Sequence, residues 1–177
     1  MTRPWILVDE RPTADGVLTL RRRGDDDYLI QLDSAVLMRS AAHFTETELG
    51  ARACAGLAGV RAPRVLVGGL GMGYTLRAAL DELPPDARVT VAELNPVVID
   101  WCRGPLAHLT GGAALDPRVE VRVEDVARTI AAAAGVRPYH AIALDLYEGT
   151  FAANERGEDP FYGPAALRRT RGALAPG

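Results

Sequence analysis

The spacing of apolar residues changes along the chain, and the change predicts a β-rich N-terminal segment followed by alternating strands and helices. Near the N-terminus, short apolar runs are separated by turn-forming pieces rich in Gly and Asp, as in one or two antiparallel hairpins. A helix is expected to begin near Thr45, because Thr45 and Glu48 have the spacing of a capping box. The N-terminal strands are expected at residues 5–8, 17–20, 28–32 and 35–38.

From residue 64 onward, strand-like and helix-like patterns alternate, which is typical of a doubly wound α/β fold with a mostly parallel sheet. The chain is therefore expected to divide into an N-terminal β-strand segment, residues 1–44, and an α/β domain, residues 45–177. Strands are expected at residues 64–68, 88–93, 118–123 and 141–146, and helices at residues 74–83, 96–109, 126–134 and 164–174.

The alternation stops just after the last predicted helix, where this kind of fold would continue with a further strand. A four-stranded parallel sheet with an uncovered edge is prone to pair with other chains. Either the sequence is a truncation that lacks C-terminal strands, or another chain covers the edge. Of the two, truncation is favoured.

Composition and charge narrow the classes of function. The 177 residues are 48% hydrophobic and carry a net charge of −3, which suits one principal domain and argues against binding to nucleic acid. No apolar stretch has the length of a membrane-spanning helix and no signal-peptide core is present, so a cytoplasmic protein without membrane contact is expected. Cys54 and Cys102 lie in separate helical patterns and are interpreted as reduced packing residues.

A glycine cluster after the first strand of the alternating region carries the most specific chemical signal. Gly69, Gly71 and Gly73 precede a predicted helix, where backbone N–H groups can face a ligand. The next strand ends at Glu93, where an acid can hydrogen-bond two ribose hydroxyls. Tyr74 stands where a dinucleotide fingerprint needs Gly or Ala, so the spacing suits a nucleoside without a pyrophosphate, such as S-adenosylmethionine. The alternative is a tight turn that binds nothing.

Carboxylates also follow the third and fourth predicted strands, at the edge of an open α/β sheet where ligands bind. Asp125 can accept a hydrogen bond from the exocyclic amine of adenine, or it can simply cap the next helix. Asp145 and Glu148 can hold an ammonium group and help remove its proton. The alternative for this pair is a solvated loop with a helix cap. Tyr147 lies in the same loop and is a candidate substrate contact.

Together these segments resemble the spermidine synthase family, the polyamine aminopropyltransferases, over roughly residues 35–177. The resemblance implies a methyltransferase-like domain behind an N-terminal β-hairpin piece. It also implies transfer of the aminopropyl group of decarboxylated S-adenosylmethionine to a small amine or polyamine, without a metal, and it favours a homodimer. The resemblance is carried by residues 65–73 and 89–98, by Asp116-Pro117-Arg118-Val119 with Asp125, and by residues 139–145.

The resemblance implies a role for each candidate residue. The three glycines of the cluster would pass close to the methionine-derived part of the cofactor, with Glu93 on the ribose and Asp125 on the adenine. Asp145 would orient the accepting amine and promote its deprotonation. Tyr147 and Glu148 would contact the same substrate.

Some positions depart from the family pattern. Met72 stands where the family carries an Asp that pairs with the aminopropyl ammonium, and Glu148 replaces the second acid of an Asp-x-x-Asp motif. The family segment Tyr-His-Glu-Met is here Glu46-Thr47-Glu48-Leu49, which keeps only the Glu.

The sequence therefore predicts a spermidine synthase-like transferase that uses a sulfonium nucleoside to alkylate a small amine. The nucleoside is decarboxylated S-adenosylmethionine or S-adenosylmethionine itself, and aminopropyl transfer is favoured. Met72 makes a methyltransferase dependent on S-adenosylmethionine the first alternative. A non-catalytic module that binds the nucleoside is the second.

Overall fold

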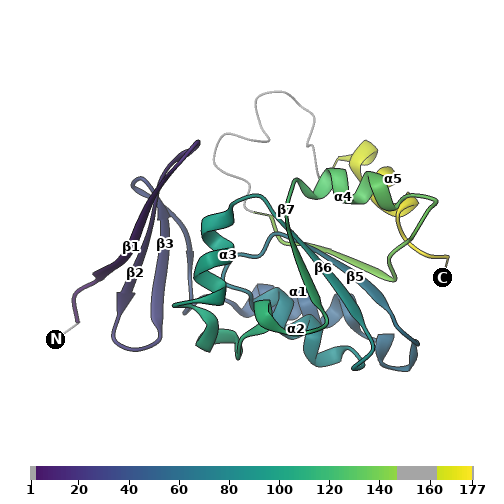
Figure 1. Cartoon of the computed structure of the whole chain (residues 1–177), viewed down its shortest axis with the longest axis horizontal. Coiled ribbons are helices and arrows are strands. Elements are labelled where there is room, and N and C mark those ends of the chain that lie inside the picture. Colours follow the sequence, from purple (N-terminus) through teal and green to yellow (C-terminus); the bar gives the residue numbers. More distant parts are fainter. Residues whose placement is uncertain (1–2, 147–162, 177) are drawn as a thin grey trace.

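The computed structural model describes residues 3–146 and 163–176, and within these ranges the chain forms two β-sheets (Figure 1). The N-terminal sheet is antiparallel with the order β1-β2-β3-β4, so the predicted strands join into one sheet. The first strand runs five residues beyond its predicted end, because its polar residues still pair with the second strand, as in Glu10 with Thr19. The strands are β1 (Ile6–Thr13), β2 (Gly16–Arg23), β3 (Asp27–Leu32) and β4 (Ala35–Arg39).

Helix α1 (Phe44–Cys54) begins where the sequence predicts a helix, but the predicted capping box is wrong. The residue at the N-cap is His43, and its side chain makes no capping hydrogen bond. Thr45 Oγ1 donates to the Glu46 carboxylate at 2.7 Å instead of accepting from a backbone N–H. No helix among residues 3–146 and 163–176 combines the length and apolarity needed to cross a membrane.

The second sheet is parallel and has the order β7-β6-β5-β8, which confirms the predicted doubly wound α/β fold. Helix α3 ends six residues earlier than predicted, because Gly104 and Pro105 interrupt it and a 3₁₀ turn, Ala107–Thr110, follows. The strands are β5 (Arg64–Gly68), β6 (Arg88–Glu93), β7 (Val119–Val123) and β8 (Ala141–Leu144). The helices are α2 (Tyr74–Glu82), α3 (Pro96–Arg103), α4 (Val126–Ala133) and α5 (Pro164–Gly172).

After α5 the chain returns to the edge of this sheet beside β8. The N–H of Tyr139 donates to the Ala173 carbonyl at 2.9 Å, and the N–H of Ala175 donates to the Tyr139 carbonyl at 2.8 Å. The resulting bridge between Tyr139 and Leu174 is parallel. The pairing lies where the alternation of the sequence calls for a further strand.

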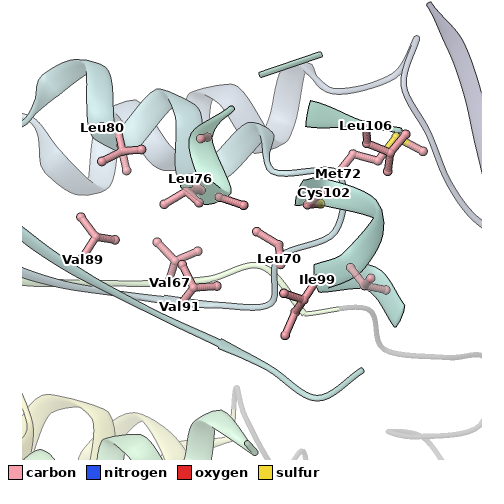
Figure 2. Packing of buried hydrophobic residues seen from close by; sticks show 14 of the residues in the cluster. Val67, Leu70, Met72, Leu76, Leu80, Val89, Val91, Ile99, Cys102 and Leu106 are labelled. Carbon is pink, nitrogen blue, oxygen red and sulfur yellow. The ribbon is translucent and has the colours of Figure 1, made fainter. Parts of the chain in front are cut away.

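Apolar side chains are buried on both faces of the parallel sheet, and β5 shows the alternation directly. Val65 and Val67 belong to the larger core, which the sheet forms with α2 and α3, whereas Leu66 packs with residues of α4 on the opposite face. Figure 2 shows Val67 and Val91 on the sheet facing Leu76 on α2. A strand buried on both faces is expected to be a continuous apolar run, as β5 is.

The N-terminal sheet is part of the same core. Leu18, Leu20 and Ile30 are fully buried in the cluster that also contains the side chains between the parallel sheet and α2. Trp101 of α3 donates from Nε1 to the carboxylate of Asp9 on β1 at 2.9 Å. These contacts hold the antiparallel sheet against the side of the α/β layer.

Within the Asp116-Pro117-Arg118-Val119 motif, Asp116 and Arg118 form an ion pair with a structural role. The guanidinium of Arg118 binds both carboxylate oxygens of Asp116 and also donates to the carbonyls of Leu80 and Leu83 at 3.1 Å each. Those two carbonyls lie at the C-terminal end of α2, where a helix leaves acceptors unpaired. The pairing with Arg118 lowers the pKa of Asp116 to about 2.

We expect Arg118→Ala to lower the free energy of unfolding at neutral pH by about 2–4 kcal/mol, since the ion pair and two helix-end hydrogen bonds are lost together. The folded pKa of Asp116 lies below its ordinary value of 3.8, so the pair stabilises fully above that value and its contribution fades as the pH falls toward about 2. Urea denaturation at neutral pH and at about pH 3 measures both effects, with a smaller difference between variant and wild type in acid.

The matched control is Arg122→Ala on β7, since Arg122 pairs with the exposed Glu120 at 2.9 Å. Exposed pairs contribute little, so this variant should change stability by less than about 0.5–1 kcal/mol. Equal losses in the two variants would contradict the structural role given to Arg118.

Candidate functional site

The candidate site lies at the carboxyl ends of the parallel strands, where the strand order reverses direction. β5 has β6 on one side and β8 on the other, and ligands of open α/β sheets bind at such a switch point. The N–H of Asp145 donates to the Gly68 carbonyl at 2.8 Å, and the N–H of Gly69 donates to the Ala92 carbonyl at 2.9 Å. Backbone hydrogen bonds therefore keep the ends of all three strands together.

A cavity of about 470 Å³ opens at these strand ends, a size suited to a small organic ligand. The residues predicted from four separate segments meet at its wall, although their roles toward a ligand remain predictions. Gly73 is the exception, because it caps α2 and lies beside Thr110. The predicted residues that line the cavity are Gly69, Gly71, Glu93, Asp125 and Asp145.

Gly69 is required by the shape of this site. Its φ is +85°, a conformation that side chains disfavour, and a Cβ there would collide with the backbone carbonyl oxygen of Asp145. The loop after β5 can therefore lie against the loop after β8 only if residue 69 is glycine. At Gly71 a Cβ would meet the thioether of Met38, which comes from β4 of the N-terminal sheet.

Met72 points away from the cavity. Its side chain is 2% exposed and packs in the larger core, close to Cys102 and Leu106 in Figure 2. An acid at this position would have to be buried among apolar groups, which is costly without a partner. The structure therefore gives Met72 a packing role in the core.

Glu93 links the glycine loop to the start of α3. Its Oε2 accepts from the N–H of Leu70 and its Oε1 from the N–H of Asn95, both at 2.8 Å. Each oxygen has a second lone pair, so these bonds orient the carboxylate and leave it able to accept from a ligand. Glu93 thus helps to hold the wall of the cavity that it lines.

The two interpretations of Asp125 are compatible in the structure. Its Oδ1 accepts from the N–H of Ala127 at 2.8 Å and caps α4, and the residue also lines the cavity. The cap fixes the side chain at the end of β7, which is the position from which it would reach a nucleoside base. Contact with adenine remains a prediction.

Asp145 is partly buried just beyond β8. Burial raises the pKa of this carboxyl above its ordinary value, a hydrogen bond from Thr75 opposes the rise, and the nearby charge of Glu46 adds to it. The Thr75 hydroxyl lies 2.6 Å from Asp145 Oδ2. An acid whose pKa is moved toward neutrality is suited to accept a proton from an ammonium group.

Glu46 is a wall residue that the predicted site did not include. It reaches the cavity from α1, whereas Glu48 of the same segment pairs with Arg52 at 2.8 Å on the surface. The signal that points to Glu46 is Gly50 one turn later: a Cβ at Gly50 would collide with α2, so the two helices touch there. A glycine inside a helix often marks such a close approach.

The charge around the cavity is strongly negative. Among its described lining residues there is no Lys, Arg or His, and the apolar part of the wall includes Leu18, Ile30, Leu37 and Met38 from the N-terminal sheet. A cavity of this kind favours a ligand with a positive charge and an apolar body. The carboxylates in the wall are those of Glu46, Glu93, Glu124, Asp125 and Asp145.

Tyr147 and Glu148 lie outside the described residues, so their assignment to the substrate stays a prediction. Within residues 3–146 and 163–176, no group of three or more His, Cys, Asp or Glu side chains is arranged to hold a metal ion.

Comparison with models of protein families finds no match, and comparison with curated protein sequences finds none either. Among solved structures, spermidine synthase from Thermotoga maritima is similar, with a TM-score of 0.73 at 19% identity over 95% of this chain and 53% of that one. A spermidine synthase in complex with the transition-state analogue AdoDATO gives 0.70 at 18% identity over 95% and 52%. The chain therefore has a spermidine synthase-like fold and spans about half the length of these structures.

We expect Asp145→Asn to raise the free energy of unfolding at neutral pH, because it removes a carboxylate whose ionisation is opposed by burial. The folded pKa lies above the ordinary value of 3.8, so the wild type loses stability as the pH rises through the interval between the two. The stability gain of the variant should therefore be small in acid, grow through this interval and then level off.

Urea denaturation across this pH range provides the measurement, and Asp15→Asn in an exposed turn serves as the control. A gain that does not depend on pH, or one shared by the control, would show that Asp145 carries no burial cost.

Proposed function

We propose that this chain is a transferase that binds a sulfonium nucleoside and uses it to alkylate a small amine, with aminopropyl transfer from decarboxylated S-adenosylmethionine favoured. The observation that carries the proposal is the single cavity at the strand ends, where Glu93, Asp125 and Asp145 face the same space. The spermidine synthase-like fold supports it.

In this proposal the residues at each strand end contact a different part of the nucleoside. Glu93 accepts hydrogen bonds from the ribose hydroxyls, and Asp125 accepts from the adenine amine. Gly69 and Gly71 let the backbone approach the chain attached to sulfur. Tyr147 and Glu148 would complete the amine site.

The charge of the wall favours the decarboxylated nucleoside over S-adenosylmethionine. The decarboxylated molecule carries a sulfonium and an ammonium and no anionic group, so both of its charges are attracted to the wall. S-adenosylmethionine adds a carboxylate, which would face several wall carboxylates without a basic side chain among the described lining residues. This difference in charge affects the binding affinity of the two nucleosides and not the rate of the chemical step.

The reaction needs an unprotonated amine held in line with a carbon–sulfur bond. In the proposal the Asp145 carboxylate takes a proton from the substrate ammonium, and the freed nitrogen lone pair attacks the carbon next to the sulfonium. The carbon–sulfur bond breaks, and its electron pair goes to sulfur to leave a neutral thioether. The product nitrogen keeps a positive charge, and Asp145 releases its proton to solvent. Alignment of the two substrates supplies much of the rate.

One observation favours a second function, methyl transfer from S-adenosylmethionine. Met72 is buried in the core, so the carboxylate that would select the aminopropyl ammonium at this position is absent from the cavity. Selection of the decarboxylated molecule would then rest on the other wall carboxylates. Direct comparison of the two nucleosides separates the two functions.

Isothermal calorimetry is expected to show at least about tenfold tighter binding of decarboxylated S-adenosylmethionine than of S-adenosylmethionine, equivalent to about 1.4 kcal/mol. The expected preference follows from repulsion between the extra carboxylate and the wall. Binding of S-adenosylmethionine alone would contradict aminopropyl transfer and support the methyltransferase.

Glu93→Ala serves as the control for the ribose contact. The substitution should weaken the binding of both nucleosides by about 1–3 kcal/mol. It should leave the ratio of the two affinities nearly unchanged, because both nucleosides carry the same ribose. A changed affinity ratio without an overall loss of affinity would place Glu93 near the end of the chain attached to sulfur, where the two nucleosides differ, rather than near the ribose.

Asp145→Asn is expected to reduce formation of methylthioadenosine from the decarboxylated nucleoside and a panel of diamines at least about 100-fold, since general base catalysis contributes factors of this size. Nucleoside affinity should stay within about twofold, because the substitution leaves the ribose and adenine contacts in place. Liquid chromatography of the nucleoside products gives the rate.

The readout of this assay also separates the remaining alternatives. Formation of S-adenosylhomocysteine from S-adenosylmethionine would support the methyltransferase. Tight binding with neither product would support the non-catalytic module.

A further inference from the structure

Thr75 has a buried hydroxyl at the junction of α1, α2 and the end of β8. It is the second residue of α2 and is 1% exposed. Its Oγ1 lies 2.6 Å from Asp145 Oδ2 and 3.1 Å from the backbone carbonyl oxygen of Glu46. The hydroxyl therefore lies between the acid of the candidate site and the helix that supplies a second wall carboxylate.

The hydroxyl has two oxygen neighbours but one proton to donate. When Asp145 is ionised, the shorter contact takes this proton, and 2.6 Å is the length expected of a hydrogen bond from a hydroxyl to a carboxylate. When Asp145 is protonated, its own proton can be donated to Thr75 Oγ1, and the Thr75 proton can turn to the Glu46 carbonyl. Both protonation states of Asp145 thus have complete hydrogen bonding at this point.

We propose that Thr75 is a positioning residue for Asp145: its hydroxyl holds Oδ2 and directs Oδ1 toward the substrate ammonium in both protonation states. The proposal rests on the proposed function for the identity of the proton donor. The contact itself does not depend on which amine is bound.

A purely structural role for Thr75 is the competing interpretation. A Cβ at Gly50 of α1 would collide with the Thr75 carbonyl, so α1 and α2 lie close together here, and Figure 1 shows the two helices on the same side of the sheet. A hydroxyl that only joins the helices would affect stability without affecting the titration of Asp145. The two interpretations therefore predict different effects of a Thr75 substitution on the pKa of Asp145.

Other charges around Asp145 are the same in each variant of the test. Glu46 faces it from α1, and Glu93, Glu124 and Asp125 share the cavity from the ends of β6 and β7. Of these carboxylates, Glu46 opposes ionisation of Asp145, in addition to the effect of burial. The Thr75 hydroxyl is the neighbour that favours the charged form.

The experiment compares Thr75→Val, which keeps the shape and removes the hydroxyl, with Thr75→Ser, which keeps the hydroxyl. The Asp145 carboxyl is titrated by carbon-13 NMR in the full chain without substrates. Thr75→Val should raise the pKa of Asp145 by about one unit, and Thr75→Ser should leave it close to that of the wild type. Thr75→Ala replaces Thr75→Val if the latter does not fold.

Thr129→Val is the matched control. Thr129 is buried on α4, and its hydroxyl has no hydrogen-bond partner within the described residues, so its loss should not move the Asp145 titration. A titration unchanged in Thr75→Val, or moved equally in Thr129→Val, would overturn the positioning role.

Turnover gives an independent readout. On the acid limb of its pH profile, kcat/KM for the amine should fall about tenfold in Thr75→Val and recover in Thr75→Ser, with nucleoside affinity unchanged. Absence of aminopropyl transfer in the wild type would count against the proposed function, whereas the NMR titration would still decide the role of Thr75.

Discussion

The carbonyl oxygen of Asp145 occupies the space where a side chain at residue 69 would begin, and the candidate site depends on this close approach. Because Gly69 lacks a Cβ and has a positive φ, the loop after β5 can lie against the loop after β8. Glu93 holds the next part of the glycine loop through the N–H of Leu70. Backbone geometry thus brings carboxylates from separate strand ends to one cavity.

The concentration of negative charge is the second consequence of this geometry. A net charge of −3 over 177 residues does not show that five carboxylates of the described residues line a single cavity. Burial, together with repulsion from the nearby Glu46 carboxylate, opposes ionisation of Asp145 and raises the pKa of this carboxyl. A cationic ligand would relieve this repulsion, so its binding would also stabilise the fold. Affinity and stability are therefore coupled at the site.

Much of the fold follows from local pattern, and the parts that do not follow depend on tertiary contacts. The bounds of β5 and β6 agree with the apolar runs because both strands are buried in the sheet. Helix α3 ends early because Gly104 and Pro105 outweigh the helical periodicity that continues beyond them. Glu46 and Thr75 join the site through the packing of α1 on α2. Gly50 signals a close approach to α1, but nothing within either segment shows that α2 is the helix that packs there.

A crystal structure of the protein with decarboxylated S-adenosylmethionine bound tests the central claim most directly. Electron density for the nucleoside is expected in the cavity, with its ribose hydroxyls on Glu93, its adenine amine at Asp125 and the chain attached to sulfur beside Gly69 and Gly71. A nucleoside bound elsewhere on the molecule, or bound in the cavity with the adenine at Asp145, would contradict the account.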